Sequence, residues 1–270
     1  MLTAETEGGQ LKAHNYWSSR QYGNLYLNAL GEHRASLEPS KIQRHREHLR
    51  PSLGQRRSTD APKPANAAKE ANTNTSSPTS EKPYVIVRKF TLANSNEPFA
   101  RIREITQLQY SSWPDFGAPA HPTHLLGLIE QCDAVVRQVN GGSPTRPDPP
   151  HGRPVLVHCS AGCGRTGTFC TVDSVLDILK RQRQARNARQ GTPMEISPAS
   201  DTGNQSEPSP FFKEERVDGN WTTRDDLDLI EKTVEDFRLQ RLSMVQSLRQ
   251  FVLCYESVLE WLVEQHPKSA

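Results

Sequence analysis

The chain has 270 residues, of which 24% are charged, and a formal net charge of +2 at pH 7. This length predicts one or two domains, and so small a net charge gives no general affinity for nucleic acid or for a membrane surface. No apolar run approaches the roughly 20 residues that span a bilayer, and five cysteines without regular spacing fit a reducing compartment better than a disulfide framework.

The chain up to residue 157 is expected to contain strands and one helix. Runs rich in apolar and β-branched residues predict strands over residues 25–30, 84–92 and 105–111. Apolar residues at helical spacing predict a helix over residues 122–139. The short apolar run at residues 155–157 indicates a further, buried strand.

The second half of the chain is expected to contain three helices. One follows from Thr166 onward, one covers residues 225–241, and the last runs from Leu248. Each has apolar residues at helical spacing. Strands that alternate with helices in this way predict a mixed sheet flanked by helices.

Two stretches are expected to be disordered insertions within one domain that spans residues 1–270. Residues 58–83 and 183–210 are rich in small and polar side chains and in proline. They bury too little apolar surface to offset the entropy lost on ordering. A basic cluster at residues 41–57 suggests either a nuclear-import signal or, as the commoner case, a solvated basic face.

The most informative segment is the loop that follows the run 155–157, because it carries Cys159, three glycines and Arg165. A helix N-terminus and successive loop amides attract an anion, and glycines let the backbone approach a ligand closely. An arginine fork grips two phosphate oxygens at once. In such a field a thiol pKa falls from about 8.5 to roughly 3.5–7.5. The loop therefore predicts a thiolate poised beneath a bound phosphate.

The segment from His158 to Gly167 reads His-Cys-Ser-Ala-Gly-Cys-Gly-Arg-Thr-Gly and resembles the signature of the protein tyrosine phosphatases. The resemblance implies that Cys159 is the nucleophile and that Arg165 stabilises the transferring phosphoryl group. It also implies that Thr166 supports the departing thiolate and that His158 orients or tunes Cys159. The residues implied to bind the phosphate are Ser160, Ala161, Gly162, Cys163, Gly164, Arg165 and Gln250.

A second segment, from Trp113 to Pro119, resembles the mobile acid loop of the same family. A tyrosyl leaving group has a pKa of about 10 and departs poorly as phenolate at neutral pH, so the chemistry requires a proton donor. The resemblance implies that Asp115 is this acid, on a loop that Trp113 and Pro119 anchor and that closes over the phosphate. Composition alone would favour an ordinary turn here.

A third segment, residues 237–250, resembles the glutamine loop of the family and the helix before it. The resemblance implies that Gln246 positions the water that hydrolyses a phosphocysteine intermediate, and that Gln250 assists it. It also implies that Arg238 and Arg241 fix the phosphate loop from behind. Taken alone, the stretch would be an amphipathic helix with exposed arginines.

The first residues of the chain resemble a hairpin that lies well inside the family domain. Glu7 takes the place of a glutamate that pairs with the catalytic arginine, and Lys12 that of a lysine that leans toward the acid loop. The family's first helices, several of its strands and its Lys-Asn-Arg-Tyr loop have no counterpart in this sequence. We therefore expect an N-terminally truncated, fungal-like member of the non-receptor class, with a mixed, mainly parallel central sheet flanked by helices.

These resemblances predict an enzyme that hydrolyses phosphotyrosine in proteins through a phosphocysteine intermediate, without a metal ion or another cofactor. The expected partners are phosphotyrosine-containing proteins, and the expected location is the cytoplasm or the nucleus. Two alternatives stay open. One is a phosphotyrosine-binding scaffold that does not turn over, and the other is a phosphatase of dual specificity.

Overall fold

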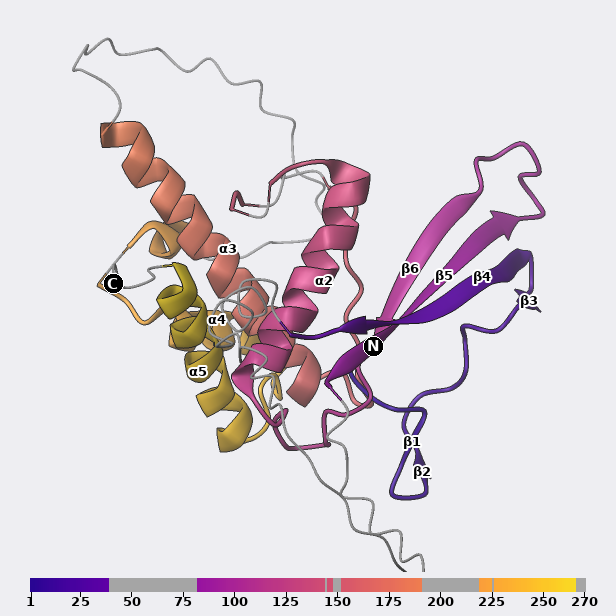
Figure 1. Cartoon of the computed structure of the whole chain (residues 1–270), viewed down its shortest axis with the longest axis horizontal. Coiled ribbons are helices and arrows are strands. Elements are labelled where there is room, and N and C mark those ends of the chain that lie inside the picture. Colours follow the sequence, from indigo (N-terminus) through magenta and orange to yellow (C-terminus); the bar gives the residue numbers. More distant parts are fainter. Residues whose placement is uncertain (39–81, 144, 148–151, 191–218, 225, 266–270) are drawn as a thin grey trace, which may run out of the picture.

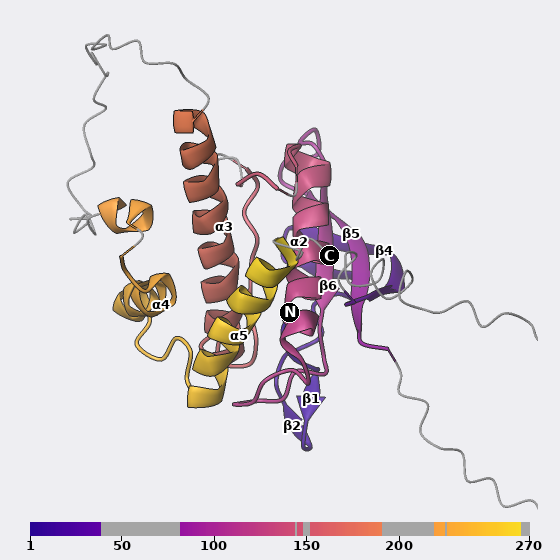
Figure 2. The ribbon, with the colours of Figure 1, turned by 60° about the vertical axis from the view of Figure 1, so that its left-hand side comes forward.

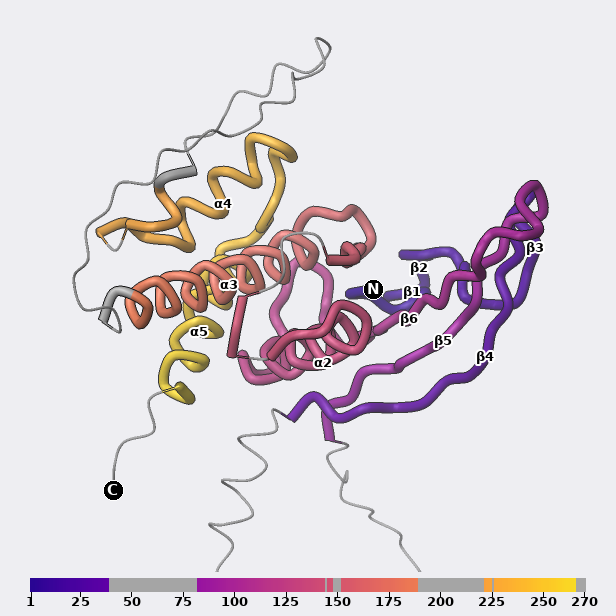
Figure 3. Tube along the Cα trace, turned by 90° about the horizontal axis from the view of Figure 1, so that it is seen from above, coloured from indigo at the N-terminus to yellow at the C-terminus, as the bar shows by residue number. Residues whose placement is uncertain are grey.

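The computed structural model describes residues 1–38, 82–143, 145–147, 152–190, 219–224 and 226–265 (Figure 1). Helices pack together on one side of the molecule, and a curved sheet extends away from them (Figures 1 and 3). The basic cluster and the stretches 58–81 and 191–210 of the two predicted insertions lie outside the described residues.

The sheet has the strand order β3-β4-β5-β6, and each neighbouring pair is antiparallel. Its strands are β3 (Arg20–Tyr22), β4 (Leu25–Ser36), β5 (Tyr84–Asn94) and β6 (Arg103–Gln109). A separate small hairpin pairs β1 (Thr6–Glu7) with β2 (Gln10–Leu11). The three strands predicted in the first half of the chain are confirmed, and β4 and β5 both run further than predicted.

The prediction of a mainly parallel sheet is wrong for the described residues. β5 and β6 follow each other in the chain and pair directly, and so short a connection produces an antiparallel pair. The run 155–157 is extended but is not a strand, and Leu156 is 88% exposed. Among the described residues no strand lies alongside this run to complete a hydrogen-bonded ladder. The run instead lines a groove of about 2000 Å³ between the sheet and α2 (Pro122–Asn140).

The first two residues tie the end of β6 to the entrance of the phosphate loop. The Tyr110 N–H donates to the Met1 carbonyl at 2.9 Å, and the Leu2 N–H donates to the His158 carbonyl at 2.8 Å. The Met1 amino group donates to the Leu108 carbonyl at 2.8 Å, and burial lowers the pKa of this amine to about 6. These bonds hold the sheet and the segment before Cys159 at a fixed separation.

Within the described ranges, the four predicted helices are all present at approximately the predicted positions. α2 and α5 (Leu248–Gln265) confirm two predictions closely. α4 (Leu229–Gln240) starts after the predicted residue 225, because the Asp228 side chain accepts hydrogen bonds from the N–H groups of Ile230 and Glu231 and so caps the helix. In the described part of the chain, none of the helices combines the length and apolarity needed to cross a bilayer.

Both ends of α3 (Gly164–Gln190) differ from the prediction. The helix starts two residues before Thr166 and continues through residues 183–190, where we predicted disorder. That part of the prediction was wrong, because the stretch contains only Arg, Gln, Ala and Asn. It has neither glycine nor proline, and most of its residues are strong helix formers.

The hydrophobic core lies where the helices meet the near end of the sheet. Figure 2 shows α5 lying against α3 and close to α2, and Val85 and Val87 of β5 extend this cluster into the sheet. The buried side chains that the helices contribute to this cluster are Leu125, Leu126, Leu128, Ile129, Phe169, Val172, Val175, Leu176, Ile230, Leu253, Cys254 and Val258. This packing fixes the first turn of α3, from which the phosphate loop emerges.

We expect Gly127→Ala to destabilise the fold strongly. A Cβ at this position in α2 would lie 1.8 Å from the carbonyl oxygen of Leu37, the residue that follows β4, so the helix would have to move away from this segment. Overpacking of this kind costs about 3 kcal/mol of unfolding free energy. Urea denaturation measures the loss. Gly31→Ala is the matched control, because an added Cβ there meets nothing within 4 Å. Equal losses in the two variants would contradict the prediction.

Candidate active site

The phosphate loop, residues 159–165, joins the extended segment at 152–158 to the first turn of α3. Gly162 has a φ of 70°, which a glycine adopts without strain. Its N–H lies 3.2 Å from the Cys159 sulfur. Ser160 and Ala161 are exposed on the loop, whereas Cys163 and Gly164 are buried. The sulfur therefore faces backbone donors at the positive end of a long helix.

The Cys159 thiol is buried, and its pKa lies below the ordinary value. Burial raises this pKa, but it is outweighed by the Thr166 hydroxyl and by the backbone N–H groups of Thr166, Gly162 and Cys163. The Gly162 N–H is a direct hydrogen bond, whereas the buried Thr166 hydroxyl has no hydrogen-bond partner within bonding geometry. We therefore attribute the stabilised thiolate to the loop amides first and to Thr166 as a longer-range contribution.

We expect iodoacetamide to alkylate Cys159 at a lower pH than it alkylates Cys170 and Cys254. The lowered pKa makes its thiolate available early, whereas burial raises the pKa of Cys170 to about 11 and that of Cys254 to about 12. Brief labelling across a pH series, followed by peptide mass spectrometry, measures the three profiles in one sample. Labelling of Cys254 in step with Cys159 would contradict the prediction.

The Arg165 guanidinium is fully buried and held by three acceptors. Its Nη1 donates to the Glu7 carboxylate and, at 2.9 Å, to the Trp113 carbonyl, and its Nη2 donates to Asp115 Oδ1 at 3.1 Å. Burial raises the pKa of Glu7, but hydrogen bonds from Thr3 and Arg165 outweigh it, so the net pKa is lowered. Glu7 therefore stays ionised and fixes the arginine fork in place.

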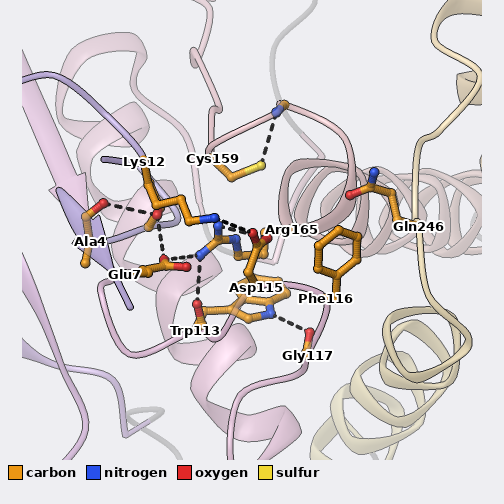
Figure 4. Close-up of polar contacts among 12 residues, drawn as sticks. Ala4, Glu7, Lys12, Trp113, Asp115, Phe116, Gly117, Cys159, Arg165 and Gln246 are labelled. Atoms are coloured by element: carbon orange, nitrogen blue, oxygen red, sulfur yellow. Dashed lines mark hydrogen bonds and ion pairs between the residues drawn. The ribbon is translucent and has the colours of Figure 1, made fainter. Parts of the chain in front are cut away.

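The acid loop is closed over the phosphate loop. Asp115 Oδ2 accepts from Lys12 Nζ at 3.0 Å, while its other oxygen contacts Arg165 (Figure 4). The fully buried Trp113 anchors the base of the loop, since its indole N–H donates to the Gly117 carbonyl at 3.0 Å. Asp115 nevertheless keeps 31% of its side chain exposed, so it can reach a ligand.

Ser247 holds the closed acid loop from the opposite side. Its hydroxyl donates to the Phe116 carbonyl at 2.9 Å, across 131 residues of sequence. Phe116 itself has a φ of 55°, a left-handed conformation that costs energy in a residue other than glycine. The sequence did not indicate this contact, because a serine beside a glutamine carries no signal of a partner so far along the chain.

The two glutamines lie beside the phosphate loop but differ in burial. Gln246 is exposed, and its Oε1 would stand 2.8 Å from a Cβ added to Gly164, so a glycine is required for this close approach. Gln250 is fully buried, and its Oε1 accepts from the N–H groups of Gln246 at 3.0 Å and Ser247 at 3.2 Å. Its Nε2 is buried without a partner. Gln250 therefore shapes the loop that carries Gln246.

The two arginines of the third segment have different contacts. Arg241 reaches the phosphate loop directly, because its Nη2 donates to the Ala161 carbonyl at 2.8 Å and its Nε lies 3.0 Å from the Cys163 sulfur. Arg238 instead donates to the carbonyls of Met244 and Val245, at 3.0 and 2.9 Å. It therefore braces the glutamine loop rather than the phosphate loop.

His158 lies next to the nucleophile and contacts a tyrosine from the start of the chain. The Tyr16 hydroxyl lies 2.5 Å from His158 Nε2, and His158 Nδ1 lies 3.3 Å from the Cys159 carbonyl. Burial lowers the pKa of His158, and the positive charge of the Met1 amine lowers it further. The sequence did not indicate a role for Tyr16, because its partner lies 142 residues further along the chain.

A family model described as Protein-tyrosine phosphatase matches residues 59–192, which include Asp115 and the whole phosphate loop. The chain belongs to the protein tyrosine phosphatase family. The membership expected from the sequence is therefore confirmed, as is an α/β fold that combines a sheet with packed helices.

Two relatives illustrate how much of a tyrosine phosphatase this chain represents. Human tyrosine-protein phosphatase non-receptor type 18 is 46% identical over 80 residues, which are 30% of this chain and 15% of the human protein. Tyrosine-protein phosphatase 3 of Saccharomyces cerevisiae is 28% identical over 184 residues, which are 65% of this chain and 15% of the yeast protein. The chain thus spans only a small part of the length of either relative.

The family also has a counterpart among solved structures. PTPN18 in complex with HER2-pY1248 phosphor-peptides aligns with 97% of this chain and 61% of its own, at 21% sequence identity and a TM-score of 0.49.

Proposed function

We propose that this chain hydrolyses phosphotyrosine in proteins through a phosphocysteine intermediate. The observation that carries the proposal is the meeting of two segments: Asp115 of the acid loop contacts Arg165 of the phosphate loop, which also carries Cys159. A thiol with a lowered pKa, a buried guanidinium and a carboxyl group that contacts this guanidinium lie in one site (Figure 4). These are the groups that transfer of a phosphoryl group from a phenol requires.

In the first step the Cys159 thiolate attacks phosphorus and the bond to the tyrosyl oxygen breaks. The loop amides and Arg165 stabilise the charge on the transferring oxygens, and Asp115 gives its proton to the leaving phenolate. A bound phosphate dianion accepts the hydrogen bond from Arg165 Nη2 that Asp115 accepts in the closed loop. Substrate binding thereby frees the carboxyl group to face the leaving oxygen.

In the second step water displaces the cysteine from phosphorus. Gln246, exposed beside the first turn of α3, orients this water as both donor and acceptor. Asp115, now ionised, takes the proton, and inorganic phosphate leaves. Thr166 supports the departing thiolate, which is consistent with its buried and unpartnered hydroxyl. The phosphate loop is held in place by Arg241 and by the Glu7–Arg165 pair. The glutamine loop is held in place by Gln250.

The proposal extends to the setting of the reaction. We propose that residues 1–270 act as a single catalytic domain on phosphotyrosine-containing signalling proteins. The cytoplasm is the proposed location, since all five cysteines are free thiols, which suits a reducing compartment.

The test measures hydrolysis and binding of a phosphotyrosine peptide on one preparation of the full chain. We expect release of inorganic phosphate, and we expect acid-quenched enzyme to carry phosphate on Cys159. Calorimetric binding without any release would overturn the proposal in favour of a phosphotyrosine-binding scaffold. Equal rates on phosphothreonine peptides would overturn the tyrosine preference and support dual specificity.

A further inference from the structure

A chain of hydrogen bonds runs from the sheet to the residue beside the nucleophile. Arg88 Nη1 donates to Gln107 Oε1 at 2.9 Å, and Gln107 Nε2 donates to the Tyr16 hydroxyl at 2.8 Å. The hydroxyl then lies 2.5 Å from His158 Nε2. The chain ends where His158 Nδ1 approaches the Cys159 carbonyl at 3.3 Å.

The arginine decides the direction of every bond in this chain. A guanidinium has donors and no acceptor, so the Gln107 oxygen must face Arg88 and the Gln107 amide nitrogen must face Tyr16. The Tyr16 oxygen therefore accepts from Gln107. In the described part of the chain its other hydrogen-bond partner is His158, so its own proton points there. A ring nitrogen that accepts this proton has to carry a lone pair, so the proton of a neutral imidazole lies on Nδ1.

Further contacts hold Arg88 and Gln107 in these orientations. Arg88 is 9% exposed, its Nη1 also donates to Gln109 Oε1 at 2.6 Å, and its Nε pairs with the Glu32 carboxylate. The guanidinium carbon lies 4.8 Å from the centre of the Trp17 ring. The Gln107 amide nitrogen lies 3.7 Å from the Met1 sulfur, which suits a donor and not an oxygen.

We propose that Arg88 is a positioning residue that, through Gln107 and Tyr16, keeps His158 neutral with its proton on Nδ1 and directed at the Cys159 carbonyl. In this form His158 fixes the first peptide of the phosphate loop without adding a positive charge beside the thiolate. The loop amides then remain the main stabilisers of Cys159. The catalytic consequence rests on the proposed function, whereas the state of the histidine can be measured without turnover.

The charged and titratable groups that face His158 are few and come from separate segments. The Met1 amine lies close enough to disfavour a positive imidazole, and burial acts in the same direction. The Cys159 thiolate acts in the opposite direction, because a negative charge favours the imidazolium. Tyr16 contacts the ring itself, with a pKa that burial raises, so its hydroxyl keeps its proton.

The decisive variant is Gln107→Glu, which reverses the direction of the chain at nearly constant shape. A carboxylate only accepts hydrogen bonds, so the Tyr16 hydroxyl would donate to the carboxylate that replaces the Gln107 amide. The Tyr16 oxygen would then accept a hydrogen bond from a proton on His158 Nε2. A histidine with N–H groups on both sides satisfies this arrangement best, so its titration midpoint should move to higher pH. NMR titration of the ¹⁵N-labelled imidazole measures this shift and identifies the protonated nitrogen in the parent chain.

Two controls separate bond direction from added charge. Gln109→Glu places the same charge beside the same Arg88 nitrogen, but the Gln109 amide nitrogen donates to the Thr3 carbonyl and not to Tyr16, so we expect a smaller shift of the His158 midpoint. In a Tyr16→Phe background, Gln107→Glu should produce no more shift than Gln109→Glu does. Tyr16 is partly exposed, so this background is suited to folding normally.

Three outcomes would overturn the proposal. They are a parent His158 with its proton on Nε2, equal shifts for Gln107→Glu and Gln109→Glu, and an undiminished effect of Gln107→Glu without the Tyr16 hydroxyl. A chain that shows the expected titration but hydrolyses no phosphopeptide would contradict the proposed function alone. As a second readout, alkylation of Cys159 in Gln107→Glu should move to lower pH, because an imidazolium stabilises the neighbouring thiolate.

Discussion

Cys159→Ser should abolish hydrolysis of an aryl phosphate, with a fall in kcat on the order of 10⁴-fold or more. The sulfur is the one atom at which a covalent phosphoryl intermediate is expected, and the loop donors lower its pKa so that the thiolate is available. A serine hydroxyl at the same place keeps its proton and attacks poorly. Phosphate release from a phosphotyrosine peptide measures the loss.

Binding of the same peptide should survive this substitution, since the loop amides and Arg165 stay in place. The matched control is Cys170→Ser on α3, which makes the same chemical change at a half-buried thiol outside the loop. The control should keep its parent rate. Turnover at the parent rate in Cys159→Ser would rule out the covalent mechanism, and lost peptide affinity would show that the loop had lost its shape.

The sequence predicted those helices and strands that are specified by the residue pattern of their own segment. α2 and α5 each carry an apolar stripe long enough to specify a helix, and β5 carries enough β-branched residues to specify a strand. The run 155–157 has the same apolar character, but a strand also needs neighbours to bond with. Which strands pair, and in which direction, depends on the segments that meet in space. The sequence therefore could not show that the run 155–157 has no partner strand among the described residues, nor that the sheet is antiparallel.

The candidate site divides in the same way. The phosphate loop, Asp115 and Gln246 were identified because a family motif carries several residues at fixed short spacing. Tyr16 and Ser247 were missed, since their partners lie 142 and 131 residues away and the contacts arise only when the elements pack. Arg88 was missed for a related reason, because it acts on His158 only through two intervening side chains.

Asp115→Asn should lower kcat for an aryl phosphate by about 10²- to 10⁴-fold and leave KM nearly unchanged. Asn keeps the shape of the side chain and can still accept a hydrogen bond from Lys12 or Arg165, so the closed acid loop should persist. It has no acidic proton to give to the leaving phenolate. The loss should therefore be largest for a tyrosyl leaving group, whose pKa is about 10, and smaller for a more acidic phenol.

The pH profile separates a lost acid from a displaced loop. A general acid must hold its proton to act, so the rate of the parent chain should fall on the alkaline side of its pH profile, and the variant should lose this fall. Asp177→Asn on the outer part of α3 is the control and should keep the parent profile. If Asp115→Asn kept the alkaline fall, or slowed all phenols by one common factor, another group would be the proton donor. Asp115 would then serve only to hold Lys12 and Arg165 together across the closed loop.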